Sequence, residues 1–194
     1  MARSVEVIRF NVLRNAIYHT ARRRQFEWWN RFFNFIVVAL GAAAIADLTT
    51  SLGISQMAIG AAVAIVGTLQ LVMDFGGSAR THQTLQRDYH QLLAEIEEAE
   101  TPDDAKRRQW DGKMIRIAGD EPPVLRALDA KAYNDAIDAT EDGGFDRSER
   151  LHIGLWPTLL GSFLQFNGTD FKKVSEIEAA AVERKRGRIV QPAE

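Results

Sequence analysis

Two apolar stretches in the first half of the chain constrain its fold more than any other feature. Between Arg31 and Asp74 the sequence has 42 residues and a single ionisable side chain, Asp47. A helix rises ~1.5 Å per residue, so about 20 apolar residues cross a ~30 Å hydrocarbon core. The ranges 32–52 and 54–74 both have about that length, and we expect each of them to span a membrane.

The link between these stretches is short and uncharged. It reads Thr-Thr-Ser-Leu-Gly-Ile-Ser over residues 49–55, which is typical of a tight turn. Asp47 stands at the far end of the first stretch, where a carboxylate reaches the membrane interface at low cost. The sequence therefore predicts an all-α membrane protein, in which a two-helix transmembrane hairpin has long helices that continue into a cytoplasmic helical bundle.

Two other interpretations of the apolar stretches are weaker. A signal peptide is suggested by the small residues Ala44-Ile45-Ala46, but 31 patterned and charged residues precede its apolar part and a second apolar stretch follows at once. A buried hairpin in a soluble protein would need a core that covers two helices apolar on nearly all faces. The remaining 150 or so polar-rich residues offer little material for such a core.

The flanking charges predict the orientation of the hairpin. Seven arginines precede the first stretch, two follow the second at Arg80 and Arg87, and the connecting loop has neither lysine nor arginine. The positive-inside rule then places both termini in the cytoplasm. Arginines and tryptophans just before the first span are the expected anchors at the membrane interface. These anchors are Arg22, Arg23, Arg24, Trp28 and Trp29.

Apolar residues at helical spacing predict more helices on both sides of the hairpin. We expect a basic amphipathic helix in residues 1–31, the hairpin in 32–75, a cytoplasmic helical region in 76–142, and a C-terminal apolar helix with a basic tail in 143–194. The helix over 80–100 has an apolar stripe that suits antiparallel packing against the N-terminal helix. Thr101-Pro102-Asp103-Asp104 predicts the next helix start, with Thr101 as N-cap.

The segment 151–166 is apolar but too short to span a membrane, and Pro157 and two glycines weaken it as a helix. One interpretation places it in the membrane interface, with Trp156, Phe163 and Phe166 dipping into lipid. The other makes it an inserted core element of the cytoplasmic bundle. The residues alone leave both open.

Several classes of function have no support in the sequence. The chain has no cysteine, so disulfides, thiolate metal sites and cysteine nucleophiles are excluded. Its four histidines show no metal-binding spacing, and no phosphate-binding glycine loop or nucleophile elbow occurs. A net charge of −2 argues against a nucleic-acid binder. We therefore expect neither an enzyme nor a protein with a cofactor or a metal site.

The second apolar stretch has one polar, small-residue face. At 100° per residue a set of its side chains falls within a band about 80° wide. The set is Gln56, Gly60, Val63, Gly67, Gln70 and Asp74. Such a face packs against a neighbouring helix, or lines a pore in an oligomer, since a single hairpin encloses no channel. Gly76 and Gly77, just beyond, are the candidate hinge.

The layout resembles a family of bacterial membrane proteins called SLATT, the SMODS- and SLOG-associating two-transmembrane effector domains. The likeness covers roughly residues 5–140 and rests on the arginine-rich helix that enters a short-looped hairpin, together with weak motifs. These motifs are Tyr18-His19, the run Arg87-Asp88-Tyr89-His90-Gln91-Leu92-Leu93-Ala94-Glu95-Ile96, and Asp120-Glu121-Pro122-Pro123 leading to Ala132-Tyr133-Asn134.

The resemblance implies an effector of a bacterial antiphage or conflict system, resident in the inner membrane as a multi-pass protein. Such an effector is expected to form homo-oligomers that open pores in or disrupt the bilayer, when a nucleotide signal or a sensor protein triggers it. The other function that the residues allow is a membrane anchor or assembly scaffold that conducts nothing.

Overall fold

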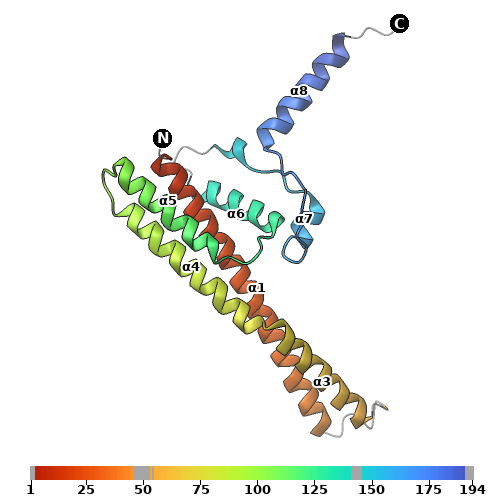
Figure 1. Ribbon diagram of the computed structural model, residues 1–194. Helices are drawn as coiled ribbons and strands as arrows, with labels where there is room; N and C mark the ends of the chain where they lie inside the picture. Colours follow the sequence, from red (N-terminus) through yellow and green to blue (C-terminus); the bar gives the residue numbers. More distant parts are fainter. Residues whose placement is uncertain (1–2, 46–52, 54, 141–145, 191–194) are drawn as a thin grey trace. The chain divides into compact units, whose positions relative to one another are not determined.

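The computed structural model describes residues 3–45, 53, 55–140 and 146–190, without the side chains of 44, 45 and 185–190. Asp47, most of the expected loop and the glycine pair at 143–144 lie outside this range. Every regular element in the described part is helical, and an isolated β-bridge joins Leu151 to Lys173. The helices are α1 (Val5–Ile45), α3 (Gln56–Met73), α4 (Phe75–Glu97), α5 (Asp104–Gly119), α6 (Arg126–Ala139), η1 (Arg147–Glu149), α7 (Leu155–Leu160) and α8 (Val174–Val190) (Figure 1).

The chain divides into two compact units, and α1 and α4 contribute residues to both. One unit comprises Met1–His19 with Leu85–Glu194, and the other is Thr20–Thr84. The sequence predicts that the N-terminal helix runs without a break into the first apolar stretch, and α1 confirms this as one helix of 41 residues.

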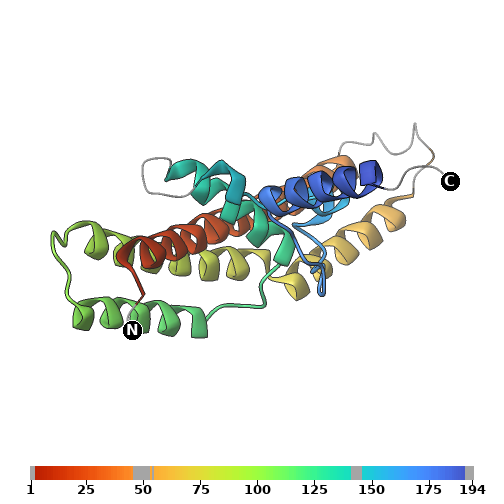
Figure 2. The ribbon, with the colours of Figure 1, turned by 90° about the horizontal axis from the view of Figure 1, so that it is seen from above.

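The first unit has a core built from α1, α4 and α5. Ile8, Val12 and Ala16 of α1 meet the predicted apolar stripe of α4, and Trp110 of α5 fills the space between them with no exposed surface. Arg9 of α1 pairs with Glu97 at the end of α4, so the two helices run antiparallel as expected. In Figures 1 and 2 α5 runs alongside α4.

Helix α5 begins two residues later than the sequence suggests. Asp103 is its N-cap, and the carboxylate accepts a hydrogen bond from the Lys106 backbone N–H at 2.7 Å. Thr101, the expected N-cap, precedes the helix. An aspartate N-cap satisfies a free backbone N–H and also carries the charge that a helix N-terminus favours, which is why Asp103 takes this place.

Helix α6 covers another face of α1 and holds the C-terminal segment. Phe10 of α1 packs edge-on against Tyr133, with ring centroids 5.1 Å apart. The buried Asn134 side chain accepts from the Leu151 backbone N–H and donates to its carbonyl, at 2.8 and 2.9 Å. A side chain that bonds both backbone groups of one residue fixes the segment that follows α6.

Helix α7 and the residue after it contact α6 at Gly161 and at the Thr158 carbonyl, which accepts a hydrogen bond from Lys131. Gly161 is buried against Ala127, where a Cβ atom would lie 2.8 Å from the alanine Cβ. The larger side chains of α7 and the turn after it face away from this contact. Leu155, Trp156, Leu159, Phe163 and Leu164 are all more than half exposed. The segment 151–166 is thus attached to the bundle without serving as its core.

Candidate functional site

In the second unit, α3 lies antiparallel to the C-terminal part of α1. Phe75, next to the end of α3, stacks on Phe33 with ring centroids 5.2 Å apart and lies 6.4 Å from Trp29. Farther along, His82 of α4 stacks on Phe26 at 5.6 Å. Residues later in the sequence of α3 and α4 contact residues earlier in the sequence of α1. The two paired helices therefore run in opposite directions.

The polar face predicted on α3 overlaps the side that packs against α1. Val63, Gly67 and Gln70 are partly buried, whereas Gln56 and Gly60 are exposed. The Gln70 side chain donates a hydrogen bond to the Asn34 side chain of α1 at 2.8 Å. Gln70 therefore joins the two helices of one hairpin, which is the packing role that the sequence offered for this face.

The glycines on this face have open space around them. An added Cβ at Gly60 or Gly67 meets no described atom within 4 Å, and the same holds for Gly41 of α1. Glycine inside a helix costs roughly 1 kcal/mol relative to alanine. Packing between the two helices of the described hairpin therefore does not explain why these positions are glycine and not alanine.

Asp74 breaks the helix between α3 and α4. Its φ of 37° is left-handed, its N–H bonds to the Gln70 carbonyl at 3.1 Å, and its own carbonyl accepts from the Ser78 N–H at 2.9 Å. The carboxylate accepts from the Gly77 N–H at 2.9 Å. One aspartate therefore ends α3 and caps the start of α4, because Asp tolerates the left-handed region and is a good N-cap.

Gly76 and Gly77, the predicted hinge, are helical residues of α4, and the break between α3 and α4 lies at Asp74. The glycine that the structure needs is Gly77. A Cβ there would lie 2.1 Å from an Asp74 carboxylate oxygen, whereas one at Gly76 would meet ordinary contacts, the nearest at 3.6 Å. Gly77 thus leaves room for the capping carboxylate.

Substituting the two glycines should give different results. Gly76→Ala is expected to raise stability by up to about 1 kcal/mol through better helix propensity. Gly77→Ala displaces the Asp74 carboxylate, and the lost cap of about 1 kcal/mol cancels the same gain. Thermal unfolding of the two variants side by side measures this, and a hinge formed by both glycines would instead make both alanines alike.

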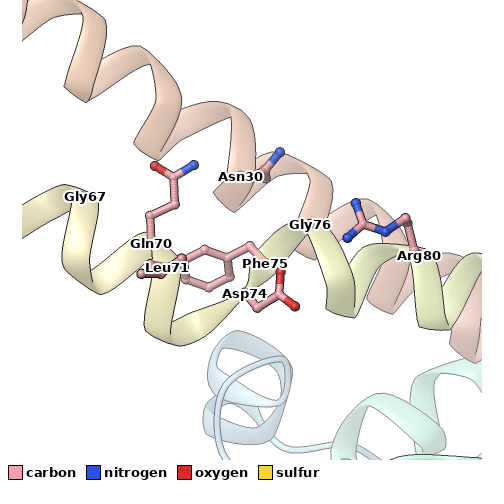
Figure 3. Close-up of a pocket in the computed structure, with 8 residues that line it drawn as sticks. All are labelled: Asn30, Gly67, Gln70, Leu71, Asp74, Phe75, Gly76 and Arg80. Atoms are coloured by element: carbon pink, nitrogen blue, oxygen red, sulfur yellow. The ribbon is translucent and has the colours of Figure 1, made fainter.

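A groove opens beside this break, within the second unit. Its volume is about 600 Å³. Figure 3 shows Asn30 of α1 and Arg80 of α4 at one end, and Leu71 toward α3, with Asp74 and Phe75 between them. Gly67, Gln70 and Gly76 complete the lining. Residues of the predicted polar face of α3 and of the predicted hinge therefore line the same groove, which has both polar and apolar walls.

The predicted interface anchors lie on α1 within the same unit. The Arg22 guanidinium lies 4.4 Å from the Phe26 ring centroid, and Arg23 pairs with Glu27 at 3.4 Å. Arg24 is exposed. Trp28 is exposed and stacks on Phe32, whereas the ring of Trp29 lies against Phe75.

Sequence reasoning missed a buried polar cluster in the first unit. His19 is fully buried, stacks on the Tyr89 ring at 5.6 Å, and places its Nε2 atom 3.1 Å from a Glu121 carboxylate oxygen. The Tyr89 hydroxyl donates to the same carboxylate. The signal was available, because His19 continues the buried helical series Ile8, Val12 and Ala16 at the next matching position.

This cluster should make the first unit sensitive to alkali. Burial, and then the Glu121 carboxylate, raise the pKa of Tyr89 far above its ordinary value. The folded state thus keeps the tyrosine proton that the unfolded chain loses near pH 10. Its contribution to stability is full below about pH 10 and falls as pH rises above it. Chemical denaturation at pH 8 and pH 11 should show this loss, and Tyr89→Phe should reduce it. An equal loss in that variant would contradict the assignment.

Comparison with known proteins adds no relative. No family model matches the chain, and neither a curated protein nor a solved structure matches it. Within the described residues, no group of three or more His, Asp or Glu side chains is placed to hold a metal ion. These comparisons therefore assign no function to the chain.

Proposed function

We propose that this chain is a two-span membrane protein whose hairpin comprises α3 and the C-terminal part of α1. The observation that carries the proposal is the exposure of α3. The helical stretch Gln56–Glu97, which begins with α3, is long and apolar enough to cross a membrane, and only 11% of its apolar window is buried. Leu71 and Val72 are 81% and 74% exposed. A core helix of a soluble protein would be covered, so a lipid phase is the surrounding that suits these side chains.

The facing part of α1 supports the first span of the hairpin. Phe35 and Val38 are also highly exposed, and residues 32–45 contain no ionisable side chain. An antiparallel pair that is apolar on its outer surface suits a bilayer hairpin with both termini on one side. The arginines before it favour the cytoplasmic side of a bacterial inner membrane.

The exposed side chains of α7 fit the same setting. Residues 151–169 carry no Asp, Glu, Lys or Arg, and their exposed residues include Trp156 and Phe163. Aromatic residues of this kind favour the membrane interface. We infer that this segment lies in the interface, which is the first of the two interpretations that the sequence left open.

We further propose that the hairpins self-associate and open the membrane in a bacterial conflict system, on a signal from a nucleotide or a sensor partner. The open space at Gly60 supports close approach by a second hairpin, since small residues let helices pack tightly in lipid. The exposed Gln56 places a further polar group on that face. The effector role itself comes from the resemblance to the SLATT family.

A non-conducting anchor or scaffold is the competing function, and one observation favours it. The Gln70 side chain is hydrogen-bonded to Asn34 inside the hairpin. Helix packing therefore accounts for the more buried of the two glutamines on this face. In that case the hairpin only holds the helical unit at the membrane.

Oligomer size and liposome leakage separate the two functions. A conducting assembly should exceed a dimer in mild detergent and release a small dye, with leakage changed by Gln56→Leu and by Gly60→Leu. Met57→Leu is the matched control, because Met57 is 85% exposed and already apolar. Oligomers that never leak, with or without cyclic nucleotides, would favour the anchor. A stable monomer would exclude the pore.

A further inference from the structure

The groove at the helix break has an apolar part and a polar part within a few residues of each other. Its lining includes Leu71 and Gly67 of α3, Asn30 of α1 and Arg80 of α4, with Asp74 at the break between α3 and α4 (Figure 3). A volume of about 600 Å³ is in the range of pockets that hold small-molecule ligands. The groove therefore suits an amphiphile and not a purely polar or purely apolar molecule.

Arg80 is the cation of this groove and has no ion-pair partner in the described part of the chain. Its guanidinium lies over Gly76, with Nη1 3.6 Å from the position of an added Cβ there, and the Asn30 amide oxygen is 3.8 Å from the same point. Other arginines of α1 and α4, such as Arg23 and Arg87, have a carboxylate within 4 Å. Asp74 uses one carboxylate oxygen to cap α4.

The depth of the groove follows from the proposed hairpin, on which this inference rests. The second span ends at Asp74, and the Arg80 guanidinium reaches back to Gly76, two residues beyond Asp74 and roughly 3 Å along a helix. The polar region on each side of a ~30 Å hydrocarbon core is about 5–8 Å thick. Arg80 and Asn30 thus lie at the level of lipid headgroups, while Leu71 and Gly67 lie at the level of the first methylenes.

We propose that the groove binds the headgroup of one phospholipid. The lipid phosphate accepts hydrogen bonds from the Arg80 guanidinium and from the Asn30 amide, and the acyl chains leave along Leu71 and Gly67. One cation and one carboxylate in the groove complement a headgroup that has a phosphate and an ammonium group. Phosphatidylethanolamine therefore binds more tightly than phosphatidylglycerol, because its ammonium group faces Asp74.

Lipid retention by the full-length protein tests this proposal. The detergent-solubilised chain is mixed with phosphatidylethanolamine, phosphatidylglycerol or inorganic phosphate, and bound ligand is measured by native mass spectrometry. Arg80→Gln should lower phosphatidylethanolamine affinity about tenfold, the loss expected for one charge-assisted contact. Arg80→Lys should keep part of the affinity. Arg87→Gln is the control, since Arg87 lies on the same helix outside the groove and pairs with Asp88.

The following results would contradict the proposal. Equal lipid binding by the protein and by Arg80→Gln would remove the groove as the site, provided that both variants have the same melting temperature. Arg80-dependent binding of inorganic phosphate as tight as that of lipid would show a site for a free anion. Carbonate extraction of the same samples is measured in parallel. A chain that is extracted refutes the hairpin, whereas one that stays in the membrane but retains no lipid through Arg80 refutes only this inference.

Discussion

Ile65→Lys is expected to stop stable integration of the chain into membranes. Ile65 lies in the middle of α3 and is 68% exposed. In water, a lysine at so exposed a position would be harmless or would improve solubility. At the centre of a membrane-spanning helix a lysine costs about 2.5–3.5 kcal/mol on insertion scales, which is enough to shift a single span out of the bilayer. The measurement is the fraction of protein that resists carbonate extraction from membranes.

Ile115→Lys is the matched control for this prediction. Ile115 lies on α5 and is 62% exposed, so the two substitutions are chemically the same and start from a similar exposure. We expect Ile115→Lys to leave membrane integration unchanged. Equal behaviour of the two variants would mean that α3 faces water, as α5 does, and would refute the transmembrane interpretation.

Trp110→Ala should produce the largest loss of stability in the helical unit outside the hairpin. Trp110 has no exposed surface and lies among Ile8, Val12 and Tyr89, so its removal opens a cavity that three helices border. Truncation of a buried tryptophan to alanine costs about 3–5 kcal/mol. In a unit of this size that loss lowers the Tm by more than about 10 °C. Circular dichroism of the detergent-solubilised protein measures the Tm.

Trp156→Ala is the comparison for that variant. Trp156 is 72% exposed on α7, so its side chain can be removed without leaving a cavity. The Tm in detergent should change by no more than a few degrees. A drop as large as that of Trp110→Ala would show that α7 belongs to the core of the bundle, which was the second interpretation of this segment.

Helical periodicity was sufficient to predict most of the helices and the pairing of α1 with α4. The apolar stripe of α4 and its antiparallel partner in α1 follow from side-chain spacing alone, because burial of apolar faces determines both. The same reasoning could not find Asp74 as the helix break. The sequence around it shows two glycines, which normally mark a bend, and the left-handed aspartate that caps α4 depends on a backbone geometry that sequence patterns do not encode.

The polar contacts were the part that sequence reasoning could not reach. The sequence placed Gln70 on a helix face that suits either packing or pore lining. Its hydrogen bond to Asn34 depends on how α1 and α3 pair, which the sequence pattern does not give. His19 and Glu121 are 102 positions apart in the chain, and they meet because α1 and the segment after α5 pack together. Arg80 likewise gains its significance from Asn30, which lies on another helix.

The topology of the hairpin is the central claim, and site-directed labelling tests it most directly. The chain has no cysteine, so single cysteines in place of Ser4, Ser55 and Ser175 can be labelled without background. A membrane-impermeant thiol reagent is applied to sealed vesicles of each orientation. We predict that Ser4→Cys and Ser175→Cys react only from the cytoplasmic side and that Ser55→Cys reacts only from the opposite side. Labelling of all three positions from the same side would contradict a two-span hairpin.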